Sequence, residues 1–183
     1  NQFDNTANYL GHYHTTGQEI WEQTKGNIDG FICSSGTGGT IAGVGKALKE
    51  KNKNIKIYLS DPKGSALYNH IKYNELKIEG NSITEGIGSS RITSNFKEAT
   101  IDDAYQIDDK EALLEIYKLI ENEGFSLGTS TGINIVGAIK MAKEMGSGKN
   151  IVTILCDRSD RYNSKLFNKD FLNSKNLPIP NWI

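Results

Sequence analysis

The sequence has no excess of charge of either sign: 21 lysines and arginines stand against 22 aspartates and glutamates, without a basic cluster. Such a surface attracts neither nucleic acid nor an anionic membrane, so we expect neither as a partner. No apolar run approaches the roughly 20 residues that cross a bilayer, and no signal peptide opens the chain. These absences predict a soluble globular protein.

Cysteine and histidine are also scarce. The two cysteines, Cys33 and Cys156, each stand at the end of an expected strand, and we interpret both as core residues rather than nucleophiles. Without a multi-cysteine framework, a reduced cytoplasmic setting is the expectation. The three histidines, His12, His14 and His70, are interpreted as ordinary surface or partly buried residues, and we expect no metal site.

Glycine is plentiful, with 19 residues, and 37% of the residues are hydrophobic, which suits an α/β protein with many tight connections. A length of 183 residues fits one domain or a large part of one. The chain begins at Asn1, without methionine, in a polar run. We therefore expect it to be a piece of a longer protein.

Alternating strand and helix patterns predict the fold. Short apolar runs indicate strands at 28–33, 55–59, 104–107 and 151–155. Between and around them, helical patterns or capping signals stand at 16–25, 41–49, 65–73, after Asp108 and around 135–142. This order predicts a mainly parallel sheet with helices on both faces. We expect the last strand to be buried on both faces, Pro62 to stop the second, 80–95 to be a loop, and the tail from Arg161 to be polar.

The stretch Ser34-Ser35-Gly36-Thr37-Gly38-Gly39-Thr40 lies between a strand and a helix. Free N–H groups and the helix dipole make such a turn an anion site, and Thr37 and Thr40 add hydroxyl donors. Because the loop has no lysine, it favours a tightly held cofactor phosphate over a transferring phosphoryl group. Gly128-Thr129-Ser130-Thr131-Gly132 leaves a strand in the same sense, so we expect both turns to face one crevice.

The same loop sequence has three other interpretations. The end of the loop lacks the Gly-Lys-Ser/Thr of a P-loop, which excludes that site. Ile41 stands where a dinucleotide fingerprint needs its third glycine, which weakens a nicotinamide-dinucleotide domain with Asp61 on the ribose. An ordinary glycine-rich turn stays open.

Three ordered motifs carry a family resemblance: Ser-Gly-Thr-Gly-Gly-Thr at 35–40, Glu-Gly-Ile-Gly at 85–88 and Gly-Thr-Ser-Thr-Gly at 128–132. They resemble those of the cysteine synthases, the O-acetylserine sulfhydrylase and cystathionine β-synthase group of fold-type-II pyridoxal-phosphate enzymes. Asn1-Gln2-Phe3, Cys156-Asp157 and Arg161-Tyr162 are similar to one branch of that group. The resemblance covers nearly the whole chain.

The resemblance implies a tryptophan-synthase-β-like fold, pyridoxal 5′-phosphate as the cofactor, and roles for individual residues. Ser130 would hydrogen-bond the pyridine nitrogen and leave the ring largely unprotonated, which suits β-elimination and replacement. Gln2 and Gly88 would contact the substrate, Gln2 at its carboxylate. The implied cofactor contacts are Gly36, Thr37, Gly38, Gly39, Thr40 and Gly86. Plainer alternatives stay open: a helix cap for Ser130, an unattached end for Gln2 and a plain loop for 85–88.

The implied activity is formation of cysteine from O-acetylserine, or a related activated serine, and sulfide by a homodimeric enzyme. Alternatives are cystathionine formation from serine and homocysteine, and a non-catalytic binding partner with the same fold. In the resemblance, Arg91 stands where sulfhydrylases carry an apolar residue, and we expect it to alter the substrate preference. Gly38→Asp is expected to weaken the cofactor by placing a carboxylate against its phosphate.

One departure from the family limits these roles. The Schiff-base lysine and the loop that grips the substrate carboxylate have no counterpart here, since Lys165 and Lys175 follow serines only in the polar tail. No catalytic residue is therefore assigned. We expect residues 1–183 to form the C-terminal, cofactor-phosphate-binding portion of a longer enzyme, inactive by itself.

Overall fold

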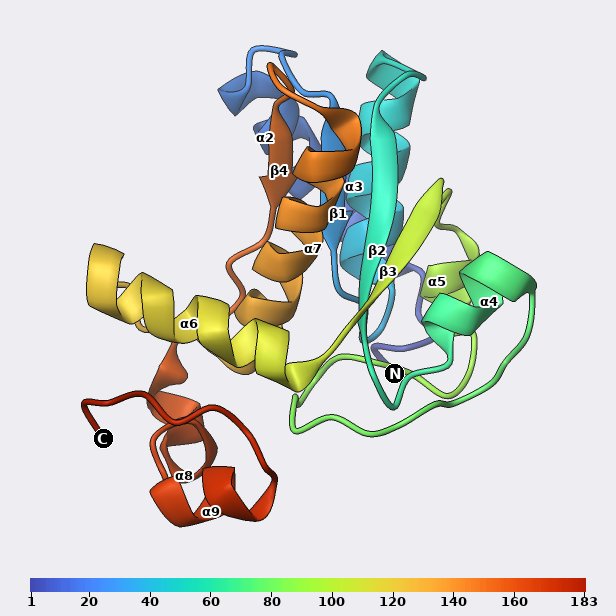
Figure 1. Cartoon of the computed structure of the whole chain (residues 1–183). Helices are drawn as coiled ribbons and strands as arrows, with labels where there is room; N and C mark the ends of the chain where they lie inside the picture. Colours follow the sequence, from blue (N-terminus) through green and yellow to red (C-terminus); the bar gives the residue numbers. More distant parts are fainter.

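A four-stranded parallel sheet forms the centre of the protein. The computed structural model describes all 183 residues and orders the strands β3-β2-β1-β4 (Figure 1). The strands are β1 (Gly30–Cys33), β2 (Lys56–Pro62), β3 (Asp103–Ile107) and β4 (Ile151–Thr153). Every neighbouring pair is parallel, because a helical crossover separates consecutive strands. The predicted α/β fold with a parallel sheet is confirmed.

Helices cover both faces of this sheet (Figure 1). One face carries α1 (Ala7–His14), α2 (Thr16–Gln23), α3 (Gly39–Lys51), α4 (Leu67–Tyr73) and α5 (Ser94–Lys97). The other carries α7 (Thr129–Met145), against which α6 (Asp109–Glu123) packs. The chain ends with the 3₁₀ turn η1 (Ser159–Tyr162), α8 (Asn163–Leu166) and α9 (Lys169–Ser174). None of these helices has the length and apolar character to cross a membrane.

Alternation along the strands divides the core into two layers. Phe31 and Cys33 of β1 pair with Ile57 and Leu59 of β2, and all four face the main cluster under α3. The residue between them, Ile32, packs with Met141 of α7 on the opposite face. Because both faces are covered, the central strands are apolar almost throughout.

The sequence predicted the start of α6 correctly. The Asp108 side chain accepts a hydrogen bond from Lys110 N at 2.8 Å, and Glu111 bonds back to the Asp108 N–H, which completes a capping box. Leu113, Ile116 and Tyr117 then recur at helical spacing on the buried face.

Two local features near the N-terminal half differ from expectation, and a third is only partly as expected. Helix α1 was not predicted, because its polar sequence has no buried residue and shows little periodicity. Thr16 does not cap α2; it lies inside the helix, and its hydroxyl is 3.0 Å from His12 Nδ1. β2 ends at Pro62, as predicted, but it is longer than the expected 55–59 because β3 pairs with it as far as Pro62, opposite Ile107.

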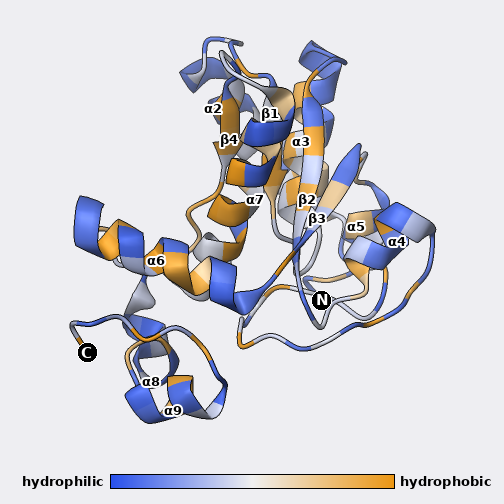
Figure 2. Cartoon of the chain, viewed as in Figure 1, coloured by the Kyte–Doolittle hydropathy of each residue, from blue (hydrophilic) through white to orange (hydrophobic).

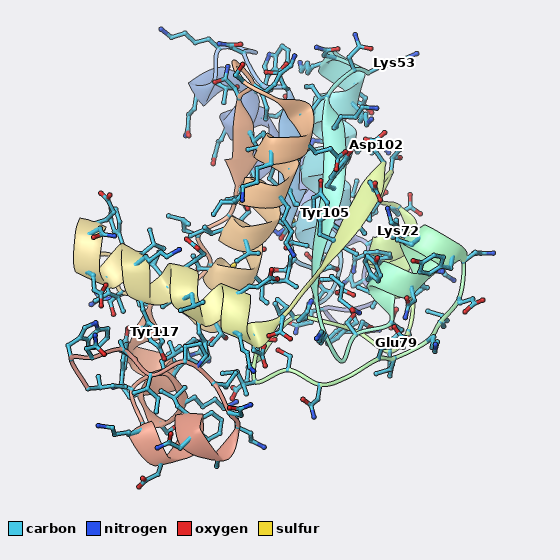
Figure 3. All side chains as sticks on the ribbon, viewed as in Figure 1. Lys53, Lys72, Glu79, Asp102, Tyr105 and Tyr117 are labelled. Carbon is cyan, nitrogen blue, oxygen red and sulfur yellow. The ribbon has the colours of Figure 1, made fainter.

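The last strand and the tail also differ from expectation. β4 is a sheet edge with three half-buried residues, and the following Leu155 is 54% exposed. The tail from Arg161 is not simply polar, since Leu166 and Leu172 are fully buried against Leu113 and Ile116 of α6. Figure 2 shows hydrophobic residues along α6 where the tail approaches it, and Figure 3 places Tyr117 at this junction. The tail therefore forms a second, smaller core.

Candidate functional site

A cavity of about 210 Å³ opens at the carboxyl ends of β1 and β4. Parallel strands expose their unpaired ends at this edge, where ligands of open α/β sheets gather. The lining residues carry no charge: they are Cys33, Ser34, Gly36, Thr37, Thr40, Gly86, Ile87, Asn134, Ile154 and Cys156. The cavity thus unites the 34–40 loop, the 85–88 motif and α7. No residue of the 128–132 turn is among its lining residues, so a crevice shared by both glycine-rich turns stays a prediction.

The 36–40 loop supplies free hydrogen-bond donors. The backbone N–H groups of Gly36, Thr37, Gly38 and Thr40 donate no hydrogen bond within the chain. The first turn of α3 has no intrahelical partners for such groups, and the helix dipole adds partial positive charge. Thr37 and Thr40, which carry hydroxyl groups, line the same cavity, and Thr40 Oγ1 lies 3.3 Å from His12 Nε2. These neutral donors fit the phosphate dianion of pyridoxal 5′-phosphate.

Two positions of the loop require glycine because the backbone of another segment lies against them. A methyl group on Gly36 would overlap the carbonyl oxygen of Gly86, so the 85–88 motif packs directly onto the loop. Gly38 has φ +89°, and a methyl group there would lie 2.6 Å from the backbone of Phe96. A carboxylate at position 38 would therefore point at Phe96 and distort the loop. This corrects the expectation that Gly38→Asp would face the phosphate directly.

Asn134 connects the ends of the two strands that frame the cavity, and sequence analysis missed it. Its Oδ1 accepts from Ser34 N at 2.7 Å, and its Nδ2 donates to the carbonyl oxygen of Ile154 at 2.8 Å. One turn earlier, Thr131 Oγ1 accepts from Cys156 N at 3.0 Å. The spacing Thr131-x-x-Asn134 on one helix face was the available signal. These bonds attach the ends of both strands to α7 beside the cavity.

The two thiols have different environments. Cys33 lies in the main core, as predicted, and burial raises the pKa of its thiol. Cys156 is not a core residue: it is exposed and lines the cavity, with its sulfur 3.3 Å from Asn134 Nδ2. Desolvation raises the pKa of the Cys156 thiol, an effect that contacts with Ser130 and Asn134 oppose.

Ser130 is buried at the N-terminal end of α7, beside the Cys156 thiol. The capping alternative for this residue is wrong, because Gly128 occupies the N-cap position and Ser130 is the second residue of the helix. Ser130 thus lies next to the cavity rather than among its lining residues.

Gln2 belongs to a held segment rather than to an unattached end. Its carbonyl oxygen accepts from Asn8 Nδ2 at 2.8 Å and from Asn95 Nδ2 at 3.1 Å. Arg91 binds the Asp4 carboxylate through two nitrogens, at 3.1 and 2.9 Å, and so clamps the same segment. Both the N-terminus and the 80–95 loop lie near the carboxyl ends of the strands in Figure 1. Arg91 is therefore a support for the N-terminal segment and does not line the cavity.

Gly88 and Asp61 do not line the described cavity, although Gly88 N donates to the carbonyl oxygen of Ser35 at 2.8 Å. Gly88 lines a different, polar cavity of about 400 Å³ together with Pro62 and Ser65. Asp61 is fully buried and accepts from Tyr68 N at 2.8 Å, so it is not available to a ribose hydroxyl. The nicotinamide-dinucleotide alternative needed Asp61 to bind a ribose, so it loses its support.

No lysine lines the cavity. Lys165 instead donates to the carbonyl oxygen of Ile83 at 3.0 Å and pairs with Glu85 at 2.5 Å. Lys175 lines a separate surface cavity beside Asp108 and Leu177. The tail lysine Lys165 therefore supports the loop that carries Gly86.

Comparison with known proteins is consistent with this site. The family described as "Pyridoxal-phosphate dependent enzyme" matches residues 1–157. The chain is 42% identical to a cysteine synthase of Dictyostelium discoideum, over 98% of this chain and 50% of that protein. It is 46% identical to cysteine synthase 1 of Emericella nidulans, over 97% of this chain and 49% of that protein.

A solved structure shares the fold as well. The O-acetylserine-dependent cystathionine β-synthase of Helicobacter pylori superposes with a TM-score of 0.81 at 34% identity. The match covers 90% of this chain and 51% of that one. The chain thus spans about half the length of the curated relatives that it matches.

Proposed function

Since this chain belongs to the family of pyridoxal-phosphate-dependent enzymes, we propose that it is the cofactor-phosphate-binding, C-terminal portion of a cysteine synthase. The activity of the whole protein would be β-replacement on O-acetylserine by sulfide. The observation that carries the proposal is the cavity with four unpartnered N–H groups and two hydroxyls at Gly36–Thr40. Its similarity to cysteine synthases over nearly its full length supports the same activity.

Each group around the cavity has a task in this proposal. The loop N–H groups and the hydroxyls of Thr37 and Thr40 would hold the phosphate, and Ser130 would hydrogen-bond the pyridine nitrogen. A neutral hydroxyl at Ser130 keeps that nitrogen largely unprotonated. The bound cofactor supplies the electron sink for β-elimination and β-replacement. Gly86 would border the cofactor with its backbone, and Gln2 would face the substrate carboxylate.

A cystathionine-forming enzyme is the second candidate, favoured by the similarity to the O-acetylserine-dependent cystathionine β-synthase of Helicobacter pylori. The sequence motifs do not separate sulfide from homocysteine as the nucleophile. A homodimer and a cytoplasmic location complete the proposal for the whole protein.

The test uses the full-length protein loaded with pyridoxal 5′-phosphate. We expect cysteine to form from O-acetylserine and sulfide faster than cystathionine forms from O-acetylserine or serine with homocysteine. Ser130→Ala should keep the fold, shift the absorption spectrum of the cofactor and slow turnover. Cystathionine as the faster product would favour the second candidate, and absence of both products would contradict the proposal.

A further inference from the structure

Asn8 is a polar residue of α1 that lies between the N-terminal segment and the 36–40 loop. Its Nδ2 donates to the carbonyl oxygen of Gln2 at 2.8 Å and to Thr37 Oγ1 at 3.0 Å. A carbonyl oxygen can only accept, so the nitrogen of the amide must be the atom that faces Gln2. This determines the orientation of the amide and makes Asn8 a donor to Thr37.

The proton of the Thr37 hydroxyl is the part of this group that has no hydrogen-bond partner in the chain. Its oxygen accepts from Asn8 Nδ2 at 3.0 Å and from Gly39 N at 3.3 Å, which uses both lone pairs. Its proton has no acceptor within the chain, and Thr37 lines the cavity. The remaining direction for that proton is toward a ligand in the cavity.

A second observation, independent of these bonds, connects Asn8 to the loop. A methyl group on Gly39 would overlap Asn8 Oδ1, so the amide fills the space that any other residue at position 39 would need. Gly39 is therefore required by the packing of Asn8 and not only by the approach of a ligand.

We propose that Asn8 is a positioning residue that turns the proton of the Thr37 hydroxyl toward the cofactor phosphate. The inference rests on the proposed cofactor site. A hydroxyl whose oxygen already accepts two bonds is held as a donor, and a phosphate dianion only accepts hydrogen bonds from such groups. Because Asn8 also holds the Gln2 carbonyl, it joins the segment near the substrate to the phosphate loop.

The experiment uses the full-length holoenzyme and two readouts, the dissociation constant of pyridoxal 5′-phosphate and the ³¹P chemical shift of its bound phosphate. Asn8→Ala and Thr37→Val should each weaken the cofactor by about tenfold, as expected for one bond to a charged group. Each should also move the ³¹P resonance. In the double variant the cofactor should bind no more than about twofold more weakly than in Thr37→Val, because Asn8 acts through that hydroxyl.

Two further variants separate orientation from stability. Asn8→Asp is nearly isosteric, and its carboxylate accepts the Thr37 proton, so it should weaken the cofactor more than Asn8→Ala does. It also serves if the smaller side chain impairs folding. Asn5→Ala is the matched control: Asn5 Oδ1 accepts from Ala7 N at 3.0 Å and so supports the start of α1 without touching Thr37. It should leave the ³¹P shift and the cofactor affinity unchanged.

The outcomes distinguish the two levels of the proposal. If Thr37→Val weakens the cofactor while Asn8→Ala retains the wild-type affinity and ³¹P shift, the inference about Asn8 is wrong and the cofactor site stands. Additive losses in the double variant, or an equal ³¹P change in Asn5→Ala, would also overturn it. If Thr37→Val binds the cofactor as the wild type does, the assignment of the phosphate site and the inference are both wrong.

Discussion

At the scale of single residues, Asp61 is a buried carboxyl group whose pKa is strongly raised by folding. It lies at the end of β2, fully buried, with Oδ2 accepting from Tyr68 N at 2.8 Å and Oδ1 without a partner. Burial raises the pKa of Asp61 from 3.8 to about 7, although the bond from the Tyr68 backbone opposes the shift. At neutral pH the fold therefore holds a partly charged carboxylate away from water.

This shift predicts a specific pH dependence of stability. Between the unfolded pKa of 3.8 and the folded pKa of about 7, the folded chain binds the proton more tightly than the unfolded chain. The contribution of Asp61 to the free energy of unfolding is thus greatest below pH 4 and falls as the pH rises to 7. The total loss is up to about 4 kcal/mol.

Asp61→Asn removes this titration and keeps an acceptor for Tyr68 N. We expect the stability of the variant relative to the wild type to rise between pH 4 and pH 8, measured by denaturant unfolding of the full-length protein. Asp160→Asn, at a carboxylate whose side chain is 69% exposed, is the control and should follow the wild-type curve. An unchanged difference between Asp61→Asn and the wild type across this range would contradict the prediction.

At the scale of elements, the N-terminal segment depends on residues 91–96. Asn95 is fully buried and donates to the carbonyl oxygens of Gln2 and Phe3, while its Oδ1 accepts from Tyr9 N at 3.1 Å. The hydrogen bonds from Arg91 hold the pKa of the Asp4 carboxyl well below its usual range, with a further bond from Ser94 N. Helix α5 therefore supports the segment that precedes α1.

Arg91→Met should loosen the segment without changing the sheet. We expect faster hydrogen–deuterium exchange in residues 1–8 of the full-length holoenzyme and a KM for the amino-acid substrate raised several-fold, with kcat little changed. The reason is that Gln2 loses one of its supports while the phosphate loop is untouched. Lys72→Met is the matched control. Lys72 of α4, labelled in Figure 3, pairs with Asp103 of β3 at 2.6 Å, away from the N-terminal segment. Equal exchange in both variants would refute the role of Arg91.

At the scale of the whole molecule, α6 lies between the smaller core of the tail and the apolar residues of α7. The larger core lies between the sheet and α3, and the smaller one between α6 and the tail. Tyr117 OH donates to the carbonyl oxygen of Leu166 at 2.8 Å, next to Lys165, which holds Ile83 and Glu85. The tail is thereby connected to the loop that borders the cavity.

Leu166→Ala should therefore affect both stability and the site. Leu166 is fully buried, so removing its side chain should lower the free energy of unfolding by about 2–5 kcal/mol. Because Lys165 is displaced with it, cofactor affinity should fall as well, measured by equilibrium dialysis of the full-length protein. Leu76→Ala, at a residue 56% exposed, should change stability by no more than about 0.5 kcal/mol and leave cofactor affinity unchanged. A wild-type cofactor affinity in Leu166→Ala would disprove the connection.

The sequence by itself determined the features that depend on local patterns. Apolar runs marked the four strands, and the Asp108–Glu111 box marked the start of α6. The strand–glycine loop–helix order predicted an anion site at Gly36–Thr40. Each signal is complete within about ten residues, because periodicity, capping and turn chemistry act between near neighbours. The ordered motifs then carried the family resemblance.

Only the tertiary structure decided how distant residues share the site. Asn134 is 100 positions from Ser34, Asn8 is 29 from Thr37, and Arg91 is 87 from Asp4, so no local pattern predicts these bonds. The same reason explains the errors at β4, whose edge position depends on strand order, and at the tail, whose leucines are buried only because α6 lies across them. Strand order and burial are properties of the packed chain, and they appear only when separate elements meet.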